Sequence, residues 1–341
     1  MKTLLITGGA GFIGSNFVRY MYSKYPDYKL VVLDALTYAG SIHNLPEGSF
    51  DSDRFEFWYG NVRNAELVDT LMAKSDMVVH FAAESHVTRS IYDNMCFFET
   101  DVLGTQVMAN SVLKHRDRIK MFIHISTSEV YGSADQDLMN EDHPLNPMSP
   151  YASAKCGADR LVYSYWQTYK IPAVIVRPFN NFGPNQHLEK LVPRFITSCI
   201  LGDPLKVHGD GSASRDWLHV QDHCEALDRL LHMPTERIEG QAINLGTRRS
   251  LSILEIAHIV KEKMGTSNRV DFIGNRPGQV FRHTCDASKA HRLLDWQPKI
   301  RFEDGIDSTI KWYVENEHWW RPQMWMRSIP IINAAGKKEL H

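Results

Sequence analysis

The sequence has no strong excess of charge of either sign. Its 341 residues include 38 Lys and Arg against 40 Asp and Glu, a formal net charge of −2. This balance argues against broad binding to nucleic acid or anionic membranes, and it leaves room for a local basic pocket. The hydrophobic fraction of 43% is that of an ordinary globular protein. At roughly 100–200 residues per domain, the length predicts about two domains, or one large fold with an attached lobe.

Cysteine is scarce, and long apolar runs are missing. The five cysteines are odd in number, lie far apart and never form a C-x-x-C pair. This spacing speaks against a disulfide framework and against a zinc site, so we expect reduced, mostly buried thiols and no bound metal. The apolar run in MKTLLITGG is too short for a signal peptide, and no later run approaches the roughly 20 residues of a membrane span. Together these features predict a cytoplasmic protein.

Short β-branched runs alternate with longer amphipathic segments in the first half of the chain. The runs lack polar alternation, as expected for strands of a parallel sheet that is covered on both faces. We predict strands over 3–7, 30–33, 77–81, 121–125 and 172–176, and helices over 15–25 and 102–115. Alternation of this kind predicts an α/β fold with a doubly wound parallel sheet.

The composition shifts at about residue 178, after which Pro, Gly and Arg are more frequent. We expect residues 1–177 to form the sheet domain, with a returning segment near 241–260. Residues 178–330 then form mainly a smaller, substrate-binding lobe, and 331–341 a tail. Four tryptophans near the end are expected to pack this part of the chain onto the body of the protein: Trp312, Trp319, Trp320 and Trp325.

A glycine-rich turn follows the first predicted strand. Gly8, Gly11 and Gly14 lead into a helical pattern, and their spacing permits a tight turn and close approach of the backbone to a diphosphate. The free N–H groups and positive dipole end of the helix favour that diphosphate. Asp34 ends the second strand, near the expected separation of about 20 residues, where a carboxylate binds an adenosine ribose and repels a 2′-phosphate. The pattern predicts a Rossmann sheet that binds NAD in preference to NADP.

Tyr151 and Lys155 form a second motif. They follow Ser149-Pro150, a candidate N-cap and first helical residue. Spacing of four places both side chains on one helix face, where the ammonium lowers the phenol pKa towards working pH. Such a pair is common and by itself indicates little. The motif gains weight only if further reactive groups lie near it.

Those groups stand where an earlier predicted strand ends, in the run Ser126-Thr127-Ser128-Glu129. Doubly wound sheets bind ligands at the carboxyl ends of their strands, so this run and the Tyr–Lys pair are expected to meet. Thr127 is suited to bond a substrate hydroxyl. Glu129 would be a carboxylate beside a hydride-transfer site.

The sequence resembles the extended short-chain dehydrogenase/reductases that act on nucleotide sugars, and it is most similar to the dTDP-glucose 4,6-dehydratases. The resemblance runs from residue 1 to about 322. The stretches that carry it are TGGAGFIGSNF, LDALTYAG, HFAAESHVTRSI, STSEVYG, SPYASAK, NNFGPNQHLEKLVP, GDGSASRDWLHVQDH, NRPG and WYVENEHWWRP.

The resemblance implies that NAD is held by Gly8, Gly11, Phe12, Ile13, Gly14, Asp34, Asn61, Val62, Ala82, Tyr151 and Lys155. Tyr151 would take the proton of the sugar 4-hydroxyl as hydride leaves C4, with Thr127 bonding that hydroxyl and Lys155 holding the nicotinamide ribose. Glu129 would then remove the C5 proton. Water would leave from C6 and the hydride would return there, giving a 4-keto-6-deoxy sugar.

The resemblance also implies a dTDP- or UDP-hexose as substrate and a homodimer that pairs through two helices of each subunit. The residues implied to bind the nucleotide sugar are Ser85, His86, Asn180, Asn181, Glu189, Lys190, Leu191, Arg215, Asn244 and Arg276. The cations among them suit a diphosphate, since ammonium and guanidinium groups bind phosphate well.

Some positions depart from the dehydratase pattern. Ser128 stands where these enzymes have an Asp that protonates the leaving hydroxyl, and serine is too weak an acid for that task. Asn61 and Thr88 replace acids that are frequent at those points. One hypothesis is that Glu129 carries both proton steps. The alternatives are a UDP-glucuronate decarboxylase or a nucleotide-sugar epimerase on the same scaffold, an elimination that keeps the alkene, and a non-catalytic NAD-binding sensor.

Overall fold

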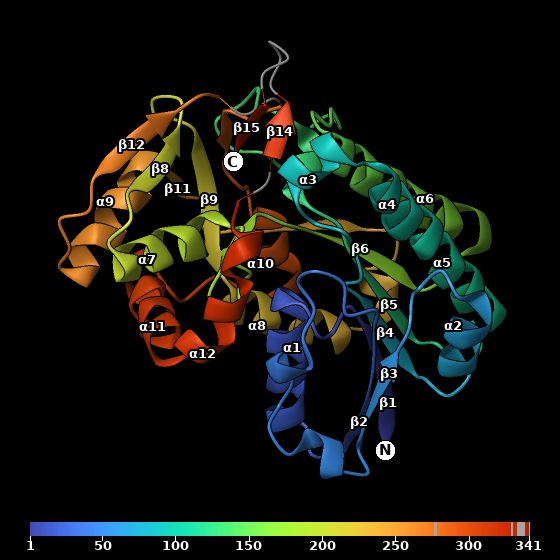
Figure 1. The fold of residues 1–341 in the computed structure, drawn as a ribbon. Helices are drawn as coiled ribbons and strands as arrows, with labels where there is room; N and C mark the ends of the chain where they lie inside the picture. The colour runs from blue at the N-terminus through green and yellow to red at the C-terminus, as the bar shows by residue number, and fades with distance from the viewer. Residues whose placement is uncertain (276–277, 329, 333–337, 341) are drawn as a thin grey trace.

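A computed structural model describes residues 1–275, 278–328, 330–332 and 338–340. Within these residues, seven parallel strands form the main sheet, in the order β10-β6-β5-β4-β1-β2-β3 (Figure 1). The strands are β1 (Lys2–Thr7), β2 (Tyr28–Asp34), β3 (Phe55–Tyr59), β4 (Met77–His80), β5 (Met121–Ile125), β6 (Ala173–Pro178) and β10 (Ala242–Leu245). The prediction of a doubly wound parallel sheet is confirmed.

Helices cover both faces of this sheet, because successive residues of each buried strand point to opposite sides. In β1, Leu4 and Ile6 pack with one set of helices and Leu5 with the other. The first set is α1 (Phe12–Lys24), α8 (Val220–Leu231) and α10 (Ser288–Leu294). The second set is α2 (Ala65–Met72), α5 (Thr105–Lys114) and α6 (Pro150–Tyr169). Figure 1 shows α1 and α2 on opposite sides of the strands.

The structure differs from the sequence prediction at two elements. No strand was predicted at β3, whose sequence FEFWY is rich in aromatics and becomes more exposed along its length, so it lacks the fully apolar run of its neighbours. The helix predicted over 102–115 begins earlier, as a π-helical segment, Phe98–Gly104, that continues into α5. A π-helical turn widens the helix and displaces its side chains, which a regular apolar spacing does not reveal.

A smaller lobe is built mainly from residues after 178. It contains a sheet of β7 (Asn180–Phe182), β9 (Ser214–His219), β11 (Ser250–Ser252) and β13 (Arg282–His283), and a pair of β8 (Leu205–His208) with β12 (Val270–Ile273). Its helices are α7 (Leu191–Leu201), α9 (Ile253–Met264), α11 (Phe302–Glu315) and α12 (Glu317–Trp320). The chain crosses between the lobes repeatedly: α8, β10 and α10 lie with the main sheet, whereas α9 packs in the smaller lobe.

The end of the described chain lies against both lobes. Trp320 is fully buried in the core of the smaller lobe, and Trp312 and Trp319 pack against that core. Trp325 is 78% exposed, so the prediction that it packs the chain end is wrong. Beyond it, β14 (Pro330–Ile332) pairs antiparallel with β15 (Lys338–Leu340), and β14 lies beside α3 (Val87–Tyr92) (Figure 1).

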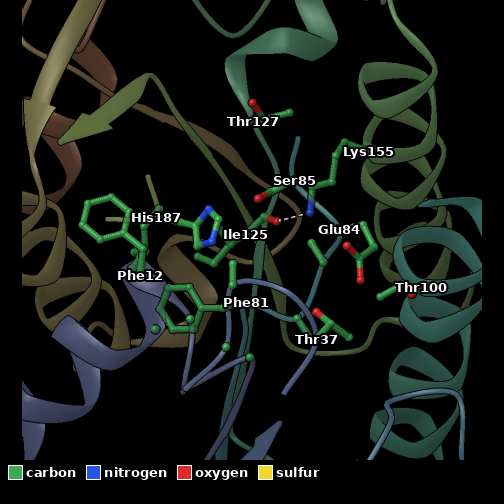
Figure 2. Close-up of a pocket in the computed structure, with 18 of the residues that line it drawn as sticks. Phe12, Thr37, Phe81, Glu84, Ser85, Thr100, Ile125, Thr127, Lys155 and His187 are labelled. Carbon is green, nitrogen blue, oxygen red and sulfur yellow. Dashed lines mark hydrogen bonds between the residues drawn. The ribbon is translucent and has the colours of Figure 1, made fainter. Parts of the chain in front are cut away.

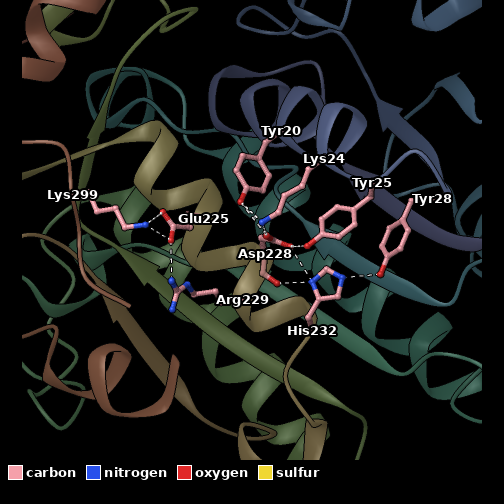
Figure 3. Close-up of polar contacts among 9 residues, drawn as sticks. All are labelled: Tyr20, Lys24, Tyr25, Tyr28, Glu225, Asp228, Arg229, His232 and Lys299. Carbon is pink, nitrogen blue, oxygen red and sulfur yellow. Dashed lines mark hydrogen bonds and ion pairs between the residues drawn. The ribbon is translucent and has the colours of Figure 1, made fainter. Parts of the chain in front are cut away.

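A buried carboxylate, Asp228, joins α1 to α8 (Figure 3). It accepts hydrogen bonds from the ammonium of Lys24 at 2.6 Å, and from the hydroxyls of Tyr20 at 3.0 Å and Tyr25 at 2.8 Å. Nδ1 of His232 lies 2.9 Å from Oδ1, the carboxylate oxygen that Tyr25 also contacts. Although burial raises its pKa, these hydrogen bonds together hold it well below the usual range.

The cysteines in the described residues are free thiols, and three of the five are buried. None of the helices described is at once long and apolar enough to span a lipid bilayer.

Candidate active site

The turn between β1 and α1 depends on its glycines. Gly8 has a φ of 68°, and a Cβ there would lie 2.5 Å from the nitrogen of Ala82. A Cβ on Gly14 would lie 2.2 Å from the carbonyl oxygen of Gly8. At Gly11 a Cβ would meet only that oxygen, at 3.4 Å, so the space beyond it is open. Helix α1 begins at Phe12 with no side-chain cap and no acid in its first turn, so its N–H groups are available to an anion.

Asp34 closes the same turn from the end of β2. Its Oδ2 accepts the N–H of Ala10 and its Oδ1 accepts the N–H of Leu36, each at 2.8 Å. Burial raises the pKa of this carboxyl, and the two N–H groups lower it. Asp34 therefore holds the glycine turn in place while it lines the adjoining cavity.

A cavity of about 320 Å³ lies at the carboxyl ends of the central strands and reaches residues 187–190 of the smaller lobe (Figure 2). All the residues predicted for the cofactor line it: Gly8, Gly11, Phe12, Ile13, Gly14, Asp34, Asn61, Val62, Ala82, Tyr151 and Lys155. The remaining predicted catalytic residues, Thr127, Ser128 and Glu129, line it as well, and so do Ser85, Asn180, Asn181, Glu189 and Lys190 of the predicted substrate set.

Two further residues of the predicted substrate set, His86 and Leu191, are not among the residues that line the cavity. His86 caps α3, where its Nδ1 accepts the N–H of Arg89 at 3.1 Å. Leu191 is the first residue of α7 and packs against the core of the smaller lobe. Arg276 lies outside the described residues.

Arg215 and Asn244 are also outside the cavity lining. The guanidinium of Arg215 donates to the carbonyl oxygen of Val280 at 2.6 Å. The amide of Asn244 accepts the Tyr131 hydroxyl at 2.7 Å and donates to the carbonyl oxygen of Met139 at 3.0 Å. These are contacts of the protein with itself, and substrate binding by the two residues stays a prediction.

Tyr151 stands in the first turn of α6, where the hydroxyl of Ser149 caps the helix by accepting a backbone N–H at 3.1 Å. Burial raises the pKa of Tyr151 above its ordinary value. The carboxylates of Asp101 and Glu129 raise it further, whereas a hydrogen bond with the Thr127 side chain lowers it. Thr127 and Tyr151 are therefore close enough to share one substrate hydroxyl.

Lys155 lies one turn further along α6 and is 3% exposed. Its ammonium donates to the carbonyl oxygen of Ile125, at the end of β5, at 2.6 Å (Figure 2). Burial lowers its pKa, and the carboxylates of Asp101 and Asp159 raise it. The predicted lowering of the Tyr151 pKa by this ammonium is not seen, because the charges that act on the phenol are carboxylates.

Glu129 lies in a 3₁₀ turn, Ser128–Tyr131, that follows β5. The turn is capped by Thr127, whose Oγ1 accepts the N–H of Glu129 at 3.2 Å. The cap joins the residue suited to bind a hydroxyl to the residue suited to remove a proton. Both line the cavity, so a bound substrate can meet them together.

Asp101 was not predicted. It lies in the π-helical segment and is 1% exposed, with Oδ1 accepting the N–H of Glu84 at 2.8 Å. Its Oδ2 has no hydrogen-bond partner among the described residues. Burial raises the pKa of Asp101 to about 7, while Lys155 lowers it. An acid within an amphipathic helix is usually exposed, so only the structure could reveal this burial.

Glu189 connects the smaller lobe to the main sheet domain. Its carboxylate is buried, accepts the Tyr38 hydroxyl at 2.8 Å and accepts Nε of Arg89 at 3.1 Å. The next residue, Lys190, donates to the carbonyl oxygen of Ser85 at 2.7 Å. These contacts bring the segments 38, 85–89 and 189–190 to one end of the cavity.

Comparison with known proteins identifies the fold and the family. Residues 5–309 match the family described as GDP-mannose 4,6 dehydratase. The chain belongs to this family. A dTDP-glucose 4,6-dehydratase of an Actinoplanes species is 41% identical over 93% of this chain and 99% of that protein. The low-salt glycan biosynthesis protein Agl12 of Haloferax volcanii is 45% identical over 92% of this chain and 99% of that protein.

The fold agrees with a solved structure. The dTDP-glucose 4,6-dehydratase of Bacillus anthracis, in complex with NAD, superposes with a TM-score of 0.87 at 37% identity and covers 95% of this chain and 100% of that chain. The predicted resemblance to the nucleotide-sugar dehydratases is confirmed. Across the part of the chain that is described, no cluster of three His, Cys, Asp or Glu is arranged to hold a metal ion.

Proposed function

We propose that this chain is an NAD-dependent 4,6-dehydratase that converts a dTDP- or UDP-hexose into its 4-keto-6-deoxy derivative. Family membership and relatives of known activity over nearly the whole chain support the reaction type. The observation that carries the proposal is one cavity lined by Thr127, Glu129 and Tyr151 next to the glycine turn. A non-catalytic NAD sensor has no need of these three groups together.

The residues around the glycine turn fit NAD. The space beside Gly11 is open, the N-terminus of α1 is uncapped, and the Asp34 carboxylate stands at the end of the next strand. The first two features suit a diphosphate, and the third suits a ribose with two free hydroxyls. When bound, NAD accepts a hydride from C4 and later returns it to C6.

Tyr151 and Thr127 serve the oxidation of C4. Tyr151 takes the proton of the 4-hydroxyl, and Thr127 bonds the oxygen of the same group. Burial raises the pKa of Tyr151 overall, and the hydrogen bond with Thr127 opposes that shift, towards the phenolate that the step requires. Lys155 holds the nicotinamide ribose in this proposal.

Glu129 serves the elimination. Its carboxylate accepts the C5 proton, which the adjacent ketone has made acidic. The C6–O bond then breaks with its electron pair, and the departing oxygen takes a proton to leave as water. The hydride then returns to C6 and C5 takes up a proton, which balances the proton that Tyr151 removed from the 4-hydroxyl. The sugar has then lost one water in total, and the cofactor is regenerated.

One end of the cavity suits the nucleotide diphosphate. Lys190 and Asn181 line it, beside the cluster that Glu189 and Arg89 form with Tyr38. We assign the substrate diphosphate to this end because the Lys190 ammonium lines it and the Arg89 guanidinium lies beside it, on Glu189. A dTDP or UDP base is proposed from the nature of the relatives and from the EKLVP segment at 189–193.

The test is to incubate the purified protein separately with dTDP-glucose, UDP-glucose, UDP-N-acetylglucosamine, GDP-mannose and UDP-glucuronate, and to analyse the products by mass spectrometry. Loss of one water from dTDP-glucose or UDP-glucose is expected. Loss of carbon dioxide, or an isomer of unchanged mass, would contradict the dehydratase assignment. In Tyr151→Phe, turnover should nearly vanish while NAD stays bound; near-normal turnover would show that Tyr151 is not the base.

We also propose a homodimer, in which the π-helical segment and α6 of each subunit form the interface. These elements carry exposed apolar side chains, and Figure 1 shows them at one edge of the molecule. The exposed side chains are Phe98, Leu103, Tyr163 and Tyr169, which we term the helix-pair surface. A cytoplasmic location belongs to the same proposal and is consistent with the free thiols.

A further inference from the structure

Ser128 lies between Thr127 and Glu129, at the centre of the proposed reaction. It lines the cavity and is 2% exposed. Its Oγ lies 3.4 Å from Nδ1 of His283, at the long end of the hydrogen-bond range. His283 is fully buried and belongs to β13 of the smaller lobe. A serine of the main sheet domain thus has a histidine partner that is 155 positions away in the sequence.

The second hydrogen bond of His283 determines which nitrogen carries the proton. Nε2 is hydrogen-bonded to the carbonyl oxygen of Gly132, and a carbonyl oxygen can only accept. Nε2 is therefore the protonated nitrogen of the neutral ring, and Nδ1 has a lone pair. Nδ1 accepts the hydrogen bond from the Ser128 hydroxyl. The Ser128 proton then faces His283, and the oxygen keeps a lone pair for a group in the cavity.

The surroundings favour the neutral form of His283. Burial lowers the pKa of His283 below its ordinary value of 6.5. Of the charged and titratable groups that face it, Glu129 raises the pKa, whereas Arg215 and His143 lower it. The ring of Phe179 packs against it edge to face, with centroids 6.0 Å apart. At neutral pH the ring is thus an acceptor for Ser128.

We propose that Ser128 and His283 are a positioning pair for the sugar hydroxyl that is lost in the elimination. This rests on the dehydratase function proposed above. The Ser128 oxygen accepts the hydrogen of that hydroxyl, which turns a lone pair of the hydroxyl oxygen towards Glu129. The proton that Glu129 takes from C5 passes to this oxygen as the C6–O bond breaks, so that water leaves and Glu129 returns to a carboxylate. No acid is required at position 128.

The pair makes the elimination sensitive to acid. As the pH falls through the pKa of His283, Nδ1 gains a proton and donates to the Ser128 oxygen. The Ser128 proton then turns to the cavity, where it opposes the hydrogen of the sugar hydroxyl and weakens the acceptor role of the one lone pair that remains. Elimination should slow as the pH falls through the pKa of His283, which burial places below its ordinary value, while the oxidation of C4 by Tyr151, which does not use the pair, should be unaffected.

The experiment compares oxidation with elimination in single-turnover reactions with dTDP-glucose from pH 5 to 8. Absorbance of the reduced cofactor reports oxidation, and mass spectrometry reports water loss. His283→Ala and Ser128→Ala should each slow elimination about tenfold, the rate equivalent of one lost hydrogen bond, and leave oxidation unchanged. The double variant should be no slower than either single variant, because the two residues act as a unit.

The conservative variant His283→Asn separates positioning from a merely structural role. Its amide oxygen replaces Nδ1 as acceptor and does not titrate, so most of the elimination rate should return and the loss at acid pH should disappear. His115→Asn, at a histidine paired with Asp69 away from the cavity, is the control and should behave as the parent protein. Circular dichroism shows whether each variant is folded. If His283→Ala is unfolded, the proposal is tested with Ser128→Ala and His283→Asn alone.

Three outcomes would overturn the proposal. Elimination in Ser128→Ala and His283→Ala could equal that of the parent protein. The loss at acid pH could persist in His283→Asn. Oxidation could fall in parallel with elimination in the variants. If the parent protein neither reduces its cofactor nor loses water from any of the nucleotide sugars, the proposed function fails instead, which is a different result.

Discussion

Glu129 is required for only one half of the proposed reaction. In Glu129→Gln, the side chain keeps its size and loses its basicity, so the C4 ketone should form and the C5 proton should stay in place. Water loss should fall about 10²–10⁴-fold, the usual contribution of a positioned base. Reduced cofactor should accumulate and be seen by its absorbance. An epimerase needs no residue in this role, and unimpaired turnover in Glu129→Gln would favour that reaction.

Asp101 is a buried acid whose protonation should affect stability. Its pKa is about 7 in the folded protein, against about 3.9 in an unfolded chain. The folded state therefore binds more protons between these values, and stability should fall as the pH rises from about 4 to 7. In Asp101→Asn this contribution is absent, so the melting temperature should fall less between pH 5 and pH 8 than in the parent protein. Equal pH dependence of the melting temperature in the two proteins would refute this role of Asp101.

The contact between α1 and α8 depends on one carboxylate. In Asp228→Asn, the hydrogen bonds of Lys24 and of the neighbouring Tyr and His side chains lose their charged acceptor. We expect the free energy of unfolding in urea to fall by about 2 kcal/mol at neutral pH. Because the pKa of Asp228 is lowered on folding, its contribution is present above the unfolded value and is lost as the pH falls through the folded one.

The adjacent cluster offers a matched control. Glu225, on the same helix, pairs with Arg229 at 3.1 Å and with Lys299 at 2.8 Å (Figure 3). Lys299 is exposed and Arg229 is half-buried, so this cluster is more open to solvent than Asp228 is. Glu225→Gln should therefore lower the free energy of unfolding by less than about 1 kcal/mol, the usual contribution of ion pairs near the surface. Similar decreases in the free energy of unfolding in Asp228→Asn and Glu225→Gln would show that burial of Asp228 does not strengthen its contacts.

The elements that depend on residues close together in the sequence were predicted. The cap of α6 by Ser149 and the turn formed by Gly8 and Gly14 depend on residues within a few positions of one another. The apolar strands at the centre of the sheet were found because burial on both faces leaves a simple pattern. Strand β3 lies at the sheet edge, where exposure relaxes that pattern.

At the scale of the whole molecule, the helix-pair surface should hold two copies together. Leu103 is 51% exposed on this surface, and a charge placed there would be buried without a partner in a dimer. Leu103→Glu should shift the mass measured by light scattering from two subunits to one. Val314→Glu, at an equally exposed residue of α11 in the smaller lobe, is the control and should leave the mass unchanged. A monomeric parent protein would rule out the dimer.

The chain itself determined the glycine turn, the acid at the end of β2, the Tyr151–Lys155 spacing and the Thr127–Glu129 run, because each depends on near neighbours. Only the tertiary structure decided which carboxyl is buried beside Lys155, that Arg215 and Asn244 contact the protein itself, and that His283 reaches Ser128. The physical reason is that burial, and contact between segments far apart in the sequence, arise only when those segments pack together in the folded protein. The sequence shows which chemical groups are present, and packing determines their contact partners and their protonation states.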